Sequence, residues 1–404
     1  MHHVPRRLLL AAACLATCGF TAPLRADANP YYFGGSLSVN QVSNIYRQSN
    51  NTNNDTVSTA SVLAGLDQSF GRQRLFADGS LNTSRYRSNA DLNNNGYNLK
   101  AGLDWSTVER LSGTVSVNNS RALGTYNVRD VAPILKKNIE DNNQLEAVAR
   151  LGLVTKFTLE AIGAYRTRRF SAAEYAQLEF DQNRFSLGIV YRPSTDLSLG
   201  VAGRITKDKY PRYSFSGGSY NPGEFERKNI DLTSRWTISG ASALEGRLSS
   251  GSSKVVNGVG TDFSGLTGLI GWTWQPTARW NLSTTLSRDT GLETSFFSQG
   301  TSIFNADQNR LTNALRFNAN YEWSSKVALN AGFSLSKTDR TNEFLGQRAS
   351  NYDRDTLFNL GVRYQLSRGI QLSCQYSKQA RDSSTALYVY DANSYGCSGQ
   401  IILN

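Results

Sequence analysis

Histidine is almost missing from this chain. The sequence of 404 residues contains two histidines, His2 and His3, and both lie at its very beginning. Imidazole is the usual general acid or base near neutral pH and a common ligand of transition metals. The rest of the chain therefore lacks Ser-His and Cys-His catalytic pairs and imidazole metal sites, so we expect no enzyme, no metal and no cofactor.

Proline and long apolar runs are also scarce. The chain has only 8 prolines but 34 glycines and 19 tyrosines, which suits long strands joined by polar turns. Beyond the first residues no stretch reaches the roughly 18 apolar residues that a membrane-spanning helix needs. Any passage of this chain across a membrane must then be made by strands.

The first residues have the order of a secretory signal. Arg6 and Arg7 precede an apolar run at residues 8–20, and small residues follow as far as Ala26. Because this run is too short to span a bilayer, we predict a signal peptide over residues 1–26 that is cleaved after Ala26.

A lipoprotein signal ending at Cys18 is the alternative, although Thr17 departs from the usual pattern before the cysteine. No Pro-rich or low-complexity linker interrupts the remainder of the chain. Residues 27–404 are therefore expected to form a single domain.

The charge of the chain is positive but diluted. The formal net charge is +11, and removal of Arg6, Arg7 and Arg25 with the signal peptide leaves 40 basic against 32 acidic residues, or +8. No run of like charges and no basic aromatic cluster occurs, so nucleic acid is not an expected partner. A positively lined pore, or a rim that faces lipopolysaccharide, explains the excess better.

Apolar and polar residues alternate in repeated segments along the chain. In a strand of a transmembrane barrel every second residue faces lipid, while its neighbours face the lumen and are often polar. Clear examples of the apolar set are Leu99, Ala101, Leu103 and Trp105; Phe185, Leu187, Ile189 and Tyr191; and Phe358, Leu360, Val362 and Tyr364. The segments number about 18, with 16 as the alternative, which predicts an all-β, antiparallel, up-and-down transmembrane barrel.

The connections between these segments alternate between short and long. Long ones are expected at residues 48–55, 88–96, 126–143, 171–178, 207–228, 251–260, 289–308, 338–353 and 380–391. Short periplasmic turns and long extracellular loops are typical of outer-membrane barrels, which predicts that both termini are periplasmic.

Aromatic residues of the apolar set lie close to the short connections. They are Trp105, Phe157, Tyr191, Trp274, Trp280, Trp323 and Tyr364. An aromatic girdle at a membrane interface is expected at this height. The alternative is a soluble β-sandwich or solenoid with tryptophans in its core.

Cys374 and Cys397 fall on the last two predicted strands. Folding the final hairpin about Leu387 pairs Ile370 with Ile401 and Cys374 with Cys397, which places both thiols on the apolar face. A disulfide formed in the periplasm and a simple contact between two small apolar side chains both fit this arrangement.

The residues between the apolar positions are rich in arginine. The arginines predicted to line the lumen are Arg150, Arg166, Arg168, Arg184, Arg192, Arg204, Arg235, Arg247, Arg316 and Arg363. Acidic residues such as Glu146, Glu160 and Glu245 share that side. A cationic surplus would favour anions and sugars that carry carboxylates, whereas arginine–acid ladders would brace the wall without selecting a solute.

Two of the expected loops have further features. The loop at residues 207–228 carries the aromatic residues Tyr210, Tyr213, Phe215, Tyr220 and Phe225. Aromatic faces among hydrogen-bonding neighbours suit sugar rings, and they equally suit packing over a barrel mouth or contact with lipopolysaccharide. The loop at residues 126–143 is a candidate for an inward-folded constriction.

Several short segments near the beginning resemble the opening of EpsL-like barrels, outer-membrane proteins associated with exosortase and extracellular polysaccharide clusters. These segments are SNIYR (43–47), DTV (55–57), RQRLFAD (72–78), RY (85–86), LNNNGY (92–97), LDW (103–105) and LSG (111–113). The resemblance is strongest over residues 43–113. It implies export or assembly of an exopolysaccharide together with periplasmic machinery, and it transfers no proven site.

Three functions therefore remain open for a barrel of this kind. The first is export of an extracellular polysaccharide, or help with its assembly, through a polar and cationic lumen. The second is a general or anion-selective diffusion porin. The third is a structural or adhesion barrel whose long Asn- and Ser-rich loops bind surfaces.

Overall fold

The computed structural model describes residues 29–127, 134–154, 156–216, 218–258, 262–290, 311–344 and 347–403. The signal peptide predicted over residues 1–26 lies outside these ranges. So does most of the long connection predicted at residues 289–308.

Strands make up nearly all of the described chain. They are β1 (Tyr31–Val42), β2 (Asp55–Phe70), β3 (Gln73–Tyr86), β4 (Asn94–Ser106), β5 (Leu111–Leu123), β6 (Ile139–Val154), β7 (Phe157–Phe170), β8 (Phe180–Tyr191), β9 (Leu197–Ser216), β10 (Ser219–Ser239), β11 (Ser242–Asn257), β12 (Phe263–Trp274), β13 (Trp280–Thr290), β14 (Leu311–Glu322), β15 (Val327–Phe344), β16 (Gln347–Gln365), β17 (Ile370–Ser383) and β18 (Tyr390–Leu403). Three short 3-10 helices lie in the connections: η1 (Ala90–Leu92), η2 (Ala173–Leu178) and η4 (Ala386–Tyr388).

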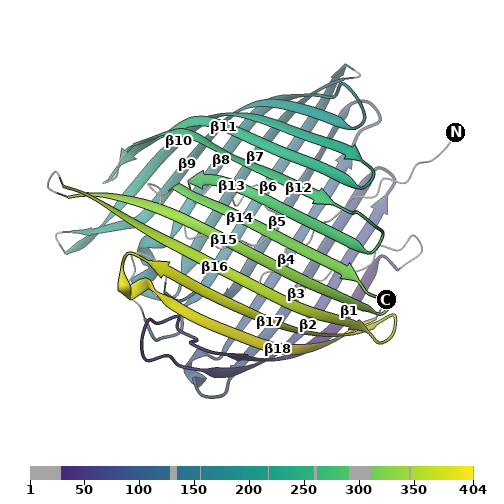
Figure 1. The fold of residues 1–404 in the computed structure, drawn as a ribbon. Helices are drawn as coiled ribbons and strands as arrows, with labels where there is room; N and C mark the ends of the chain where they lie inside the picture. Colours follow the sequence, from purple (N-terminus) through teal and green to yellow (C-terminus); the bar gives the residue numbers. More distant parts are fainter. Residues whose placement is uncertain are drawn as a thin grey trace.

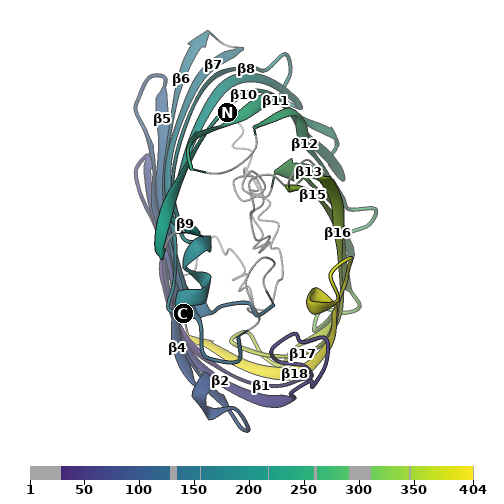
Figure 2. The same cartoon turned by 90° about the vertical axis from the view of Figure 1, so that its left-hand side faces the viewer.

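The strands form one closed sheet. Each strand pairs antiparallel with its neighbours in sequence, and β1 pairs with β18, so the 18-stranded sheet has no free edge. The strands cross the barrel obliquely in Figure 1, and the view in Figure 2 shows the oval ring that they enclose. The predicted up-and-down barrel of about 18 strands is confirmed.

The outer face of the barrel is apolar. Large hydrophobic side chains at every second position point outward, and Leu37 and Leu81 are 69% and 67% exposed. A continuous apolar surface of this extent around a closed barrel is stable in lipid rather than in water, because lipid-facing strands carry such a band. The chain is therefore a β-barrel of the bacterial outer membrane.

Aromatic rings gather on this outer face near the short turns. Phe157 stacks on Tyr191 with ring centroids 4.8 Å apart, and Trp280 contacts Tyr321 at 4.6 Å. Trp323 lies in the next turn and is 64% exposed. This is the girdle that marks a membrane interface, and it identifies the short-turn end as periplasmic.

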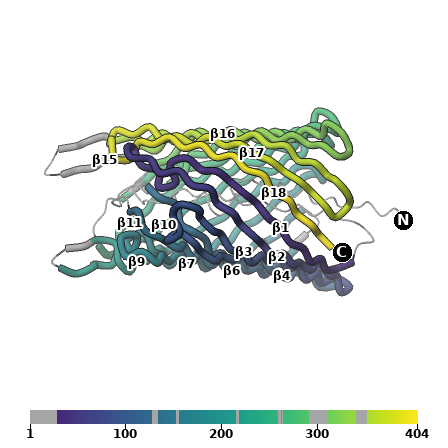
Figure 3. Tube along the Cα trace, turned by 90° about the horizontal axis from the view of Figure 1, so that it is seen from below, coloured from purple at the N-terminus to yellow at the C-terminus, as the bar shows by residue number. Residues whose placement is uncertain are grey.

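Both ends of the barrel sequence, Tyr31 and Leu403, lie at the short-turn end, as Figure 1 shows for the C-terminus. At the opposite end the hairpins β9–β10 and β15–β16 extend beyond the other strands (Figure 3). No helix among the described residues is both long and apolar enough to cross a membrane.

The prediction that residues 207–228 form an extracellular loop is wrong. β9 continues to Ser216 and β10 begins at Ser219, so the segment is a hairpin that turns at Gly218, whose φ is +81°. All five aromatic residues placed in that loop, Tyr210, Tyr213, Phe215, Tyr220 and Phe225, therefore lie on strands. Residues with high strand propensity continue the pairing of β9 and β10 beyond the membrane. The outward positions there are no longer apolar, so the alternation that marks a strand in the sequence is lost.

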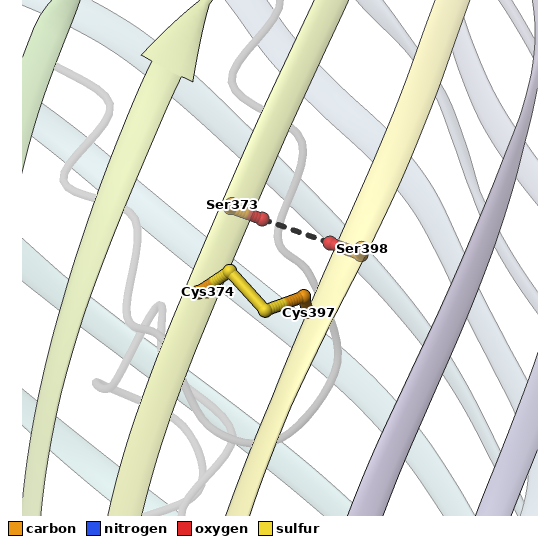
Figure 4. Close-up of a disulfide and its surroundings, with 4 residues drawn as sticks. All are labelled: Ser373, Cys374, Cys397 and Ser398. Carbon is orange, nitrogen blue, oxygen red and sulfur yellow. Dashed lines mark hydrogen bonds between the residues drawn. A yellow bond between two sulfur atoms is a disulfide. The ribbon is translucent and has the colours of Figure 1, made fainter.

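The final hairpin has the register predicted from the sequence. Ile370 lies opposite Ile401 and Cys374 lies opposite Cys397. A disulfide joins the two cysteines (Figure 4), and the adjacent inward pair, Ser373 and Ser398, shares a hydrogen bond of 2.8 Å. Because Leu372 and Ile401 are exposed on the same side as the cysteines, the disulfide lies on the lipid-facing surface.

We expect the double substitution C374S/C397S to lower the free energy of unfolding of the barrel by up to about 3 kcal/mol. The disulfide links residues 23 positions apart, and closing a loop of this size reduces the entropy of the unfolded chain by about that amount. Denaturant unfolding of the oxidised barrel and the variant measures the difference. Oxidised and reduced wild-type protein of equal stability would contradict the expectation.

Candidate functional site: the lumen and its extracellular constriction

Strand parity directs the predicted arginines inward. Of the ten, nine lie on the inward-facing positions of β6 to β11, β14 and β16. Arg192 is the exception, because it lies in the periplasmic turn after β8 and donates to Thr158 Oγ1 at 2.8 Å. It belongs to the rim of the barrel rather than to the wall of the lumen.

Three arginine–aspartate pairs are buried in the wall formed by β8 to β13. Arg204 Nε and Asp231 Oδ2 are 2.7 Å apart, and both side chains are at most 5% exposed. Arg247 lies 3.0 Å from Asp289 on β13. A buried charge is stable only when it is paired and hydrogen-bonded. Loss of one member of such a pair therefore destabilises the barrel by leaving the other charge buried alone.

The third buried pair shares an aspartate with an amide. Arg227 donates to Asp208 Oδ2 at 2.6 Å, and Gln182 donates to Asp208 Oδ1 at 2.6 Å. Strands β8, β9 and β10 are thus joined by side chains as well as by their backbones. The chain of contacts stiffens this wall of the barrel.

Other inward arginines also have acidic partners. Arg150 pairs with Glu160 at 2.6 Å and Arg184 with Glu146 at 2.8 Å. Arg363 pairs with Glu322 at 3.0 Å. Of the two interpretations left open by the sequence, these positions favour arginine–acid pairs that brace the wall over a cationic lining free to select anions.

Arg166 and Arg168 on β7 lie among aromatic rings instead. The guanidinium of Arg168 is 4.9 Å from the ring centroid of Phe180 and donates to the carbonyl of Leu178 at 3.1 Å. Arg166 lies 5.5 Å from the same ring. Cation–π contacts with these rings help to hold the two guanidinium groups in the wall of the barrel.

Three of the aromatic residues predicted in the loop at residues 207–228 complete this cluster. Tyr210 and Phe225 are each 2% exposed and pack with Phe180 on the inner side of the extended hairpin. Tyr213 joins them at 5.2 Å from Phe225, where the register between β9 and β10 is irregular. These rings pack together on the inner side of β8 to β10 toward the extracellular end. Tyr220 is not part of this cluster and is 43% exposed.

Two arginines differ from the rest in their surroundings. Arg235 is exposed near the periplasmic end and lies opposite Glu245 in the register of β10 and β11. Arg316 is half-buried on β14, opposite Thr285 and Ser334.

The exposure of inward side chains changes along the barrel axis. Near the periplasmic end Arg235 and Glu245 are exposed, and Glu322 is 48% exposed. Higher in the barrel Asp289 and Asp353 are almost fully buried. Inward side chains are therefore solvent-exposed near the periplasmic end of the described barrel and more deeply buried toward the extracellular end.

The wall opposite the buried ion pairs is mostly neutral. The inward positions of β17, β18, β1, β2 and β3 carry mainly serine, threonine, asparagine and glutamine. Their hydroxyls pair across strands, as in Ser377–Ser394 at 2.8 Å and Thr59–Ser84 at 3.0 Å. The lumen therefore has a charged wall and a neutral, hydrogen-bonding wall.

The described start of the connection between β5 and β6 reaches β17 and the β1–β2 connection at the extracellular end of the barrel. Asn127, in the connection between β5 and β6, is 1% exposed. Its carbonyl accepts a hydrogen bond from Arg381 Nη1 on β17 at 2.7 Å, and its side chain donates to the carbonyl of Arg47 at 2.5 Å. Arg47 Nε donates in turn to Gln379 at 3.2 Å. We call these four residues the constriction.

Three residues at or beside the constriction have a left-handed backbone conformation. Asn44, Arg47 and Asn127 have φ values of 48°, 55° and 53°. The left-handed conformation costs a residue other than glycine about 1–3 kcal/mol, and it persists only where surrounding contacts hold it. Hydrogen bonds from Asn44 Nδ2 to the carbonyls of Gln48 and Asp391 supply such contacts.

An apolar cluster supports the inward loops. Tyr46, Leu92 and Tyr126 are buried together with Ile45, and Ile134 packs against them. Ile134 also contacts the neighbouring cluster around Tyr175 on η2. These contacts agree with the prediction of an inward fold for residues 126–127 and 134–138, whereas residues 139–143 of the predicted loop belong to β6.

An ion pair links two of these loops, and we expect the link to weaken in acid. Lys136 Nζ lies 2.7 Å from Glu174 on η2, and the hydrogen bond from Lys136 lowers the pKa of Glu174 below its ordinary value of 4.5. A depressed folded pKa gives stabilisation that is present above pH 4.5 and is lost as the pH falls through the folded value. Hydrogen exchange of residues 134–138 should accelerate over that range, and E174Q should remove the pH dependence. Equal pH profiles for both proteins would contradict this.

Among the described residues no group of three or more histidine, cysteine, aspartate or glutamate side chains is placed to hold a metal ion. The site offers arginines, carboxylates, hydroxyls and amides around a solvated space. It can therefore hydrate, orient and pass polar solutes.

Comparison with known proteins finds similarity in shape only. The chain matches no known protein-family profile and no curated protein sequence. Among solved structures, OccK9 (OpdG) of Pseudomonas aeruginosa is 11% identical with a TM-score of 0.47, covering 92% of this chain and 98% of its own. OccAB3 of Acinetobacter baumannii is 10% identical with a TM-score of 0.47, covering 92% and 99%.

The FrpB iron transporter of Neisseria meningitidis is a larger protein of similar shape. It is 13% identical with a TM-score of 0.47, and the match covers 87% of this chain but 61% of FrpB. The strand pairing and the apolar outer belt, rather than these likenesses, establish the fold described above.

Sequence reasoning missed several residues of the site. Arg227, Asp208 and Asp289 fall in segments interpreted as loops, although inward parity continues through each of them. Arg381 on β17 and Asn127 were missed for a different reason. Their contact joins residues 254 positions apart, which no local pattern reveals.

Proposed function

We propose that this barrel is a diffusion channel for small polar solutes in the outer membrane. The observation that carries the proposal is a closed barrel whose polar inward face is solvated in its periplasmic half. The paired arginines support a channel with little preference between anions and cations, since each ion pair cancels most of its own field. The constriction at the extracellular end would then set the size limit.

Solute flux into proteoliposomes tests this proposal. We expect liposomes that contain the barrel to swell in small neutral sugars, with rates that fall steeply as the sugar becomes larger. Liposomes without protein are the control. Swelling that does not exceed the control for any of the solutes would refute a diffusion channel.

A second candidate function is the export of an extracellular polysaccharide. Two observations favour it: the resemblance to EpsL-like barrels over residues 43–113, and the neutral wall of hydroxyl and amide side chains, which suits hydrogen bonding to sugar rings. Deletion of the gene should then abolish surface polymer while the precursors remain inside the cell. Normal surface polymer after deletion would remove this candidate and leave the diffusion channel.

A further inference from the structure

An apolar groove crosses the outer, lipid-facing surface of the barrel between β17 and β4. It has a volume of about 860 Å³. Small residues form its floor, and branched apolar side chains form its walls. The floor residues are Gly35, Ala60 and Gly399, and the wall residues include Leu37, Val62, Leu81 and Leu372.

The groove follows the hydrogen-bonding direction of the sheet. Ile401, Gly35, Val62, Leu81, Tyr97 and Arg121 are successive partners on β18, β1, β2, β3, β4 and β5. Neighbouring strands are about 4.8 Å apart, so this row is about 24 Å long. Because the strands are tilted, the row climbs from the periplasmic end of β18 to the extracellular end of β5.

The extracellular end of the groove is cationic. A second hollow of about 580 Å³ shares Leu81 and Asn95 with the groove and is lined by Arg121 and Lys137. Arg121 is 48% exposed, and its distance of 3.7 Å from Asp141 is long for an ion pair. Lys137 is exposed and donates to the carbonyl of Asn93 at 3.1 Å. Both cations keep donors that face the hollow's solvent.

We propose that the groove and its cationic end bind one phosphorylated, acylated lipid of the outer leaflet, of the lipid A class. An acyl chain occupies the groove, and a phosphate lies between Arg121 and Lys137. Apolar burial and charge-assisted hydrogen bonds then act on the two ends of the same molecule. A second copy of the barrel would complement the apolar floor but not the pair of cations.

Binding of lipid A to the full barrel, stripped of lipid in detergent and followed by native mass spectrometry, tests the site. We expect bisphosphorylated lipid A to bind as one molecule per barrel and dephosphorylated lipid A to bind at least tenfold more weakly. The substitution R121Q/K137Q should lower the affinity for the phosphorylated lipid about tenfold or more, because each lost charge-assisted hydrogen bond is worth at least that factor.

Two further variants separate the site from general effects. Gly35→Leu fills the groove, and its added Cβ meets only the carbonyl of Ser61 at 3.5 Å, an ordinary contact that leaves the strand in place. It should weaken binding while the cations are intact. Lys228→Gln is the matched control, an outward cation on β10 that is 67% exposed, and it should bind like wild type. Equal affinity for both forms of lipid A, an equal loss in the control, or a dimer in place of the lipid complex would overturn the proposal.

Discussion

Replacing Asp231 with alanine is expected to lower the free energy of unfolding of the barrel by about 3–5 kcal/mol. The carboxylate accepts two hydrogen bonds from Arg204, at 2.7 and 3.0 Å, and both side chains are almost completely buried. Removing it leaves a buried guanidinium without its counter-charge, and the cost of that desolvated charge far exceeds the value of an ordinary contact.

Two comparisons make this result specific. The double substitution R204M/D231L removes both charges and should recover most of the lost stability. Glu322→Ala breaks the pair with Arg363, whose side chains are 40% and 48% exposed, and should cost only about 0–1 kcal/mol. Denaturant unfolding in lipid vesicles measures all three. If D231A lowered the free energy of unfolding no more than E322A does, the pair of Arg204 and Asp231 would not be buried as described.

Replacing Arg381 with alanine is expected to open the constriction and raise the conductance of the channel severalfold. This side chain donates to the carbonyl of Asn127 at 2.7 Å and to Asp355 at 2.6 Å, and it lies 5.1 Å from the ring centroid of Tyr390. Without it the strained backbone at Asn127 loses the contact that ties the loop to β17. The loop should then leave the lumen for part of the time.

Single-channel recording tests this expectation. The variant should show a larger mean conductance and frequent switching between two levels, while Lys378→Ala serves as the control. Lys378 is on the same strand but faces outward, where it pairs with Asp391 at 3.3 Å. A conductance of R381A equal to wild type would mean that the loop does not limit the channel.

The number of strands, their parity and the register of the last hairpin could be predicted from the sequence. The reason is physical: a lipid-facing strand must place an apolar residue at every second position, so a slip of one residue would turn all of them toward the lumen. The same constraint placed Cys374 opposite Cys397 and directed Arg204 and Arg247 inward.

The extracellular half could not be predicted in the same way. Above the membrane the outward positions of β9 and β10 carry Lys207, Lys209 and Glu226, so the hydrophobic pattern that marks a strand disappears although the strands continue. Which arginines form ion pairs could not be predicted either. The answer depends on which strands are neighbours and on which residues lie opposite each other along the barrel axis.

The constriction lies furthest from any local pattern. It brings together the β1–β2 loop, the β5–β6 loop and β17, and its hydrogen bonds involve backbone carbonyls, which every residue possesses. The positive φ values of Asn44 and Asn127 fit asparagine's tolerance of the left-handed region. Most asparagines among the described residues nevertheless have negative φ values.

The reversal potential of single channels across a salt gradient is the most direct test of the central claim, that the lumen is a polar channel in which most of the inward arginines are neutralised by ion pairs. With the full barrel in a planar bilayer and potassium chloride at different concentrations on the two sides, we predict a measurable conductance and a reversal potential close to zero. A strong anion preference would show that the arginines act as unpaired cations, and the absence of conductance would contradict the channel itself.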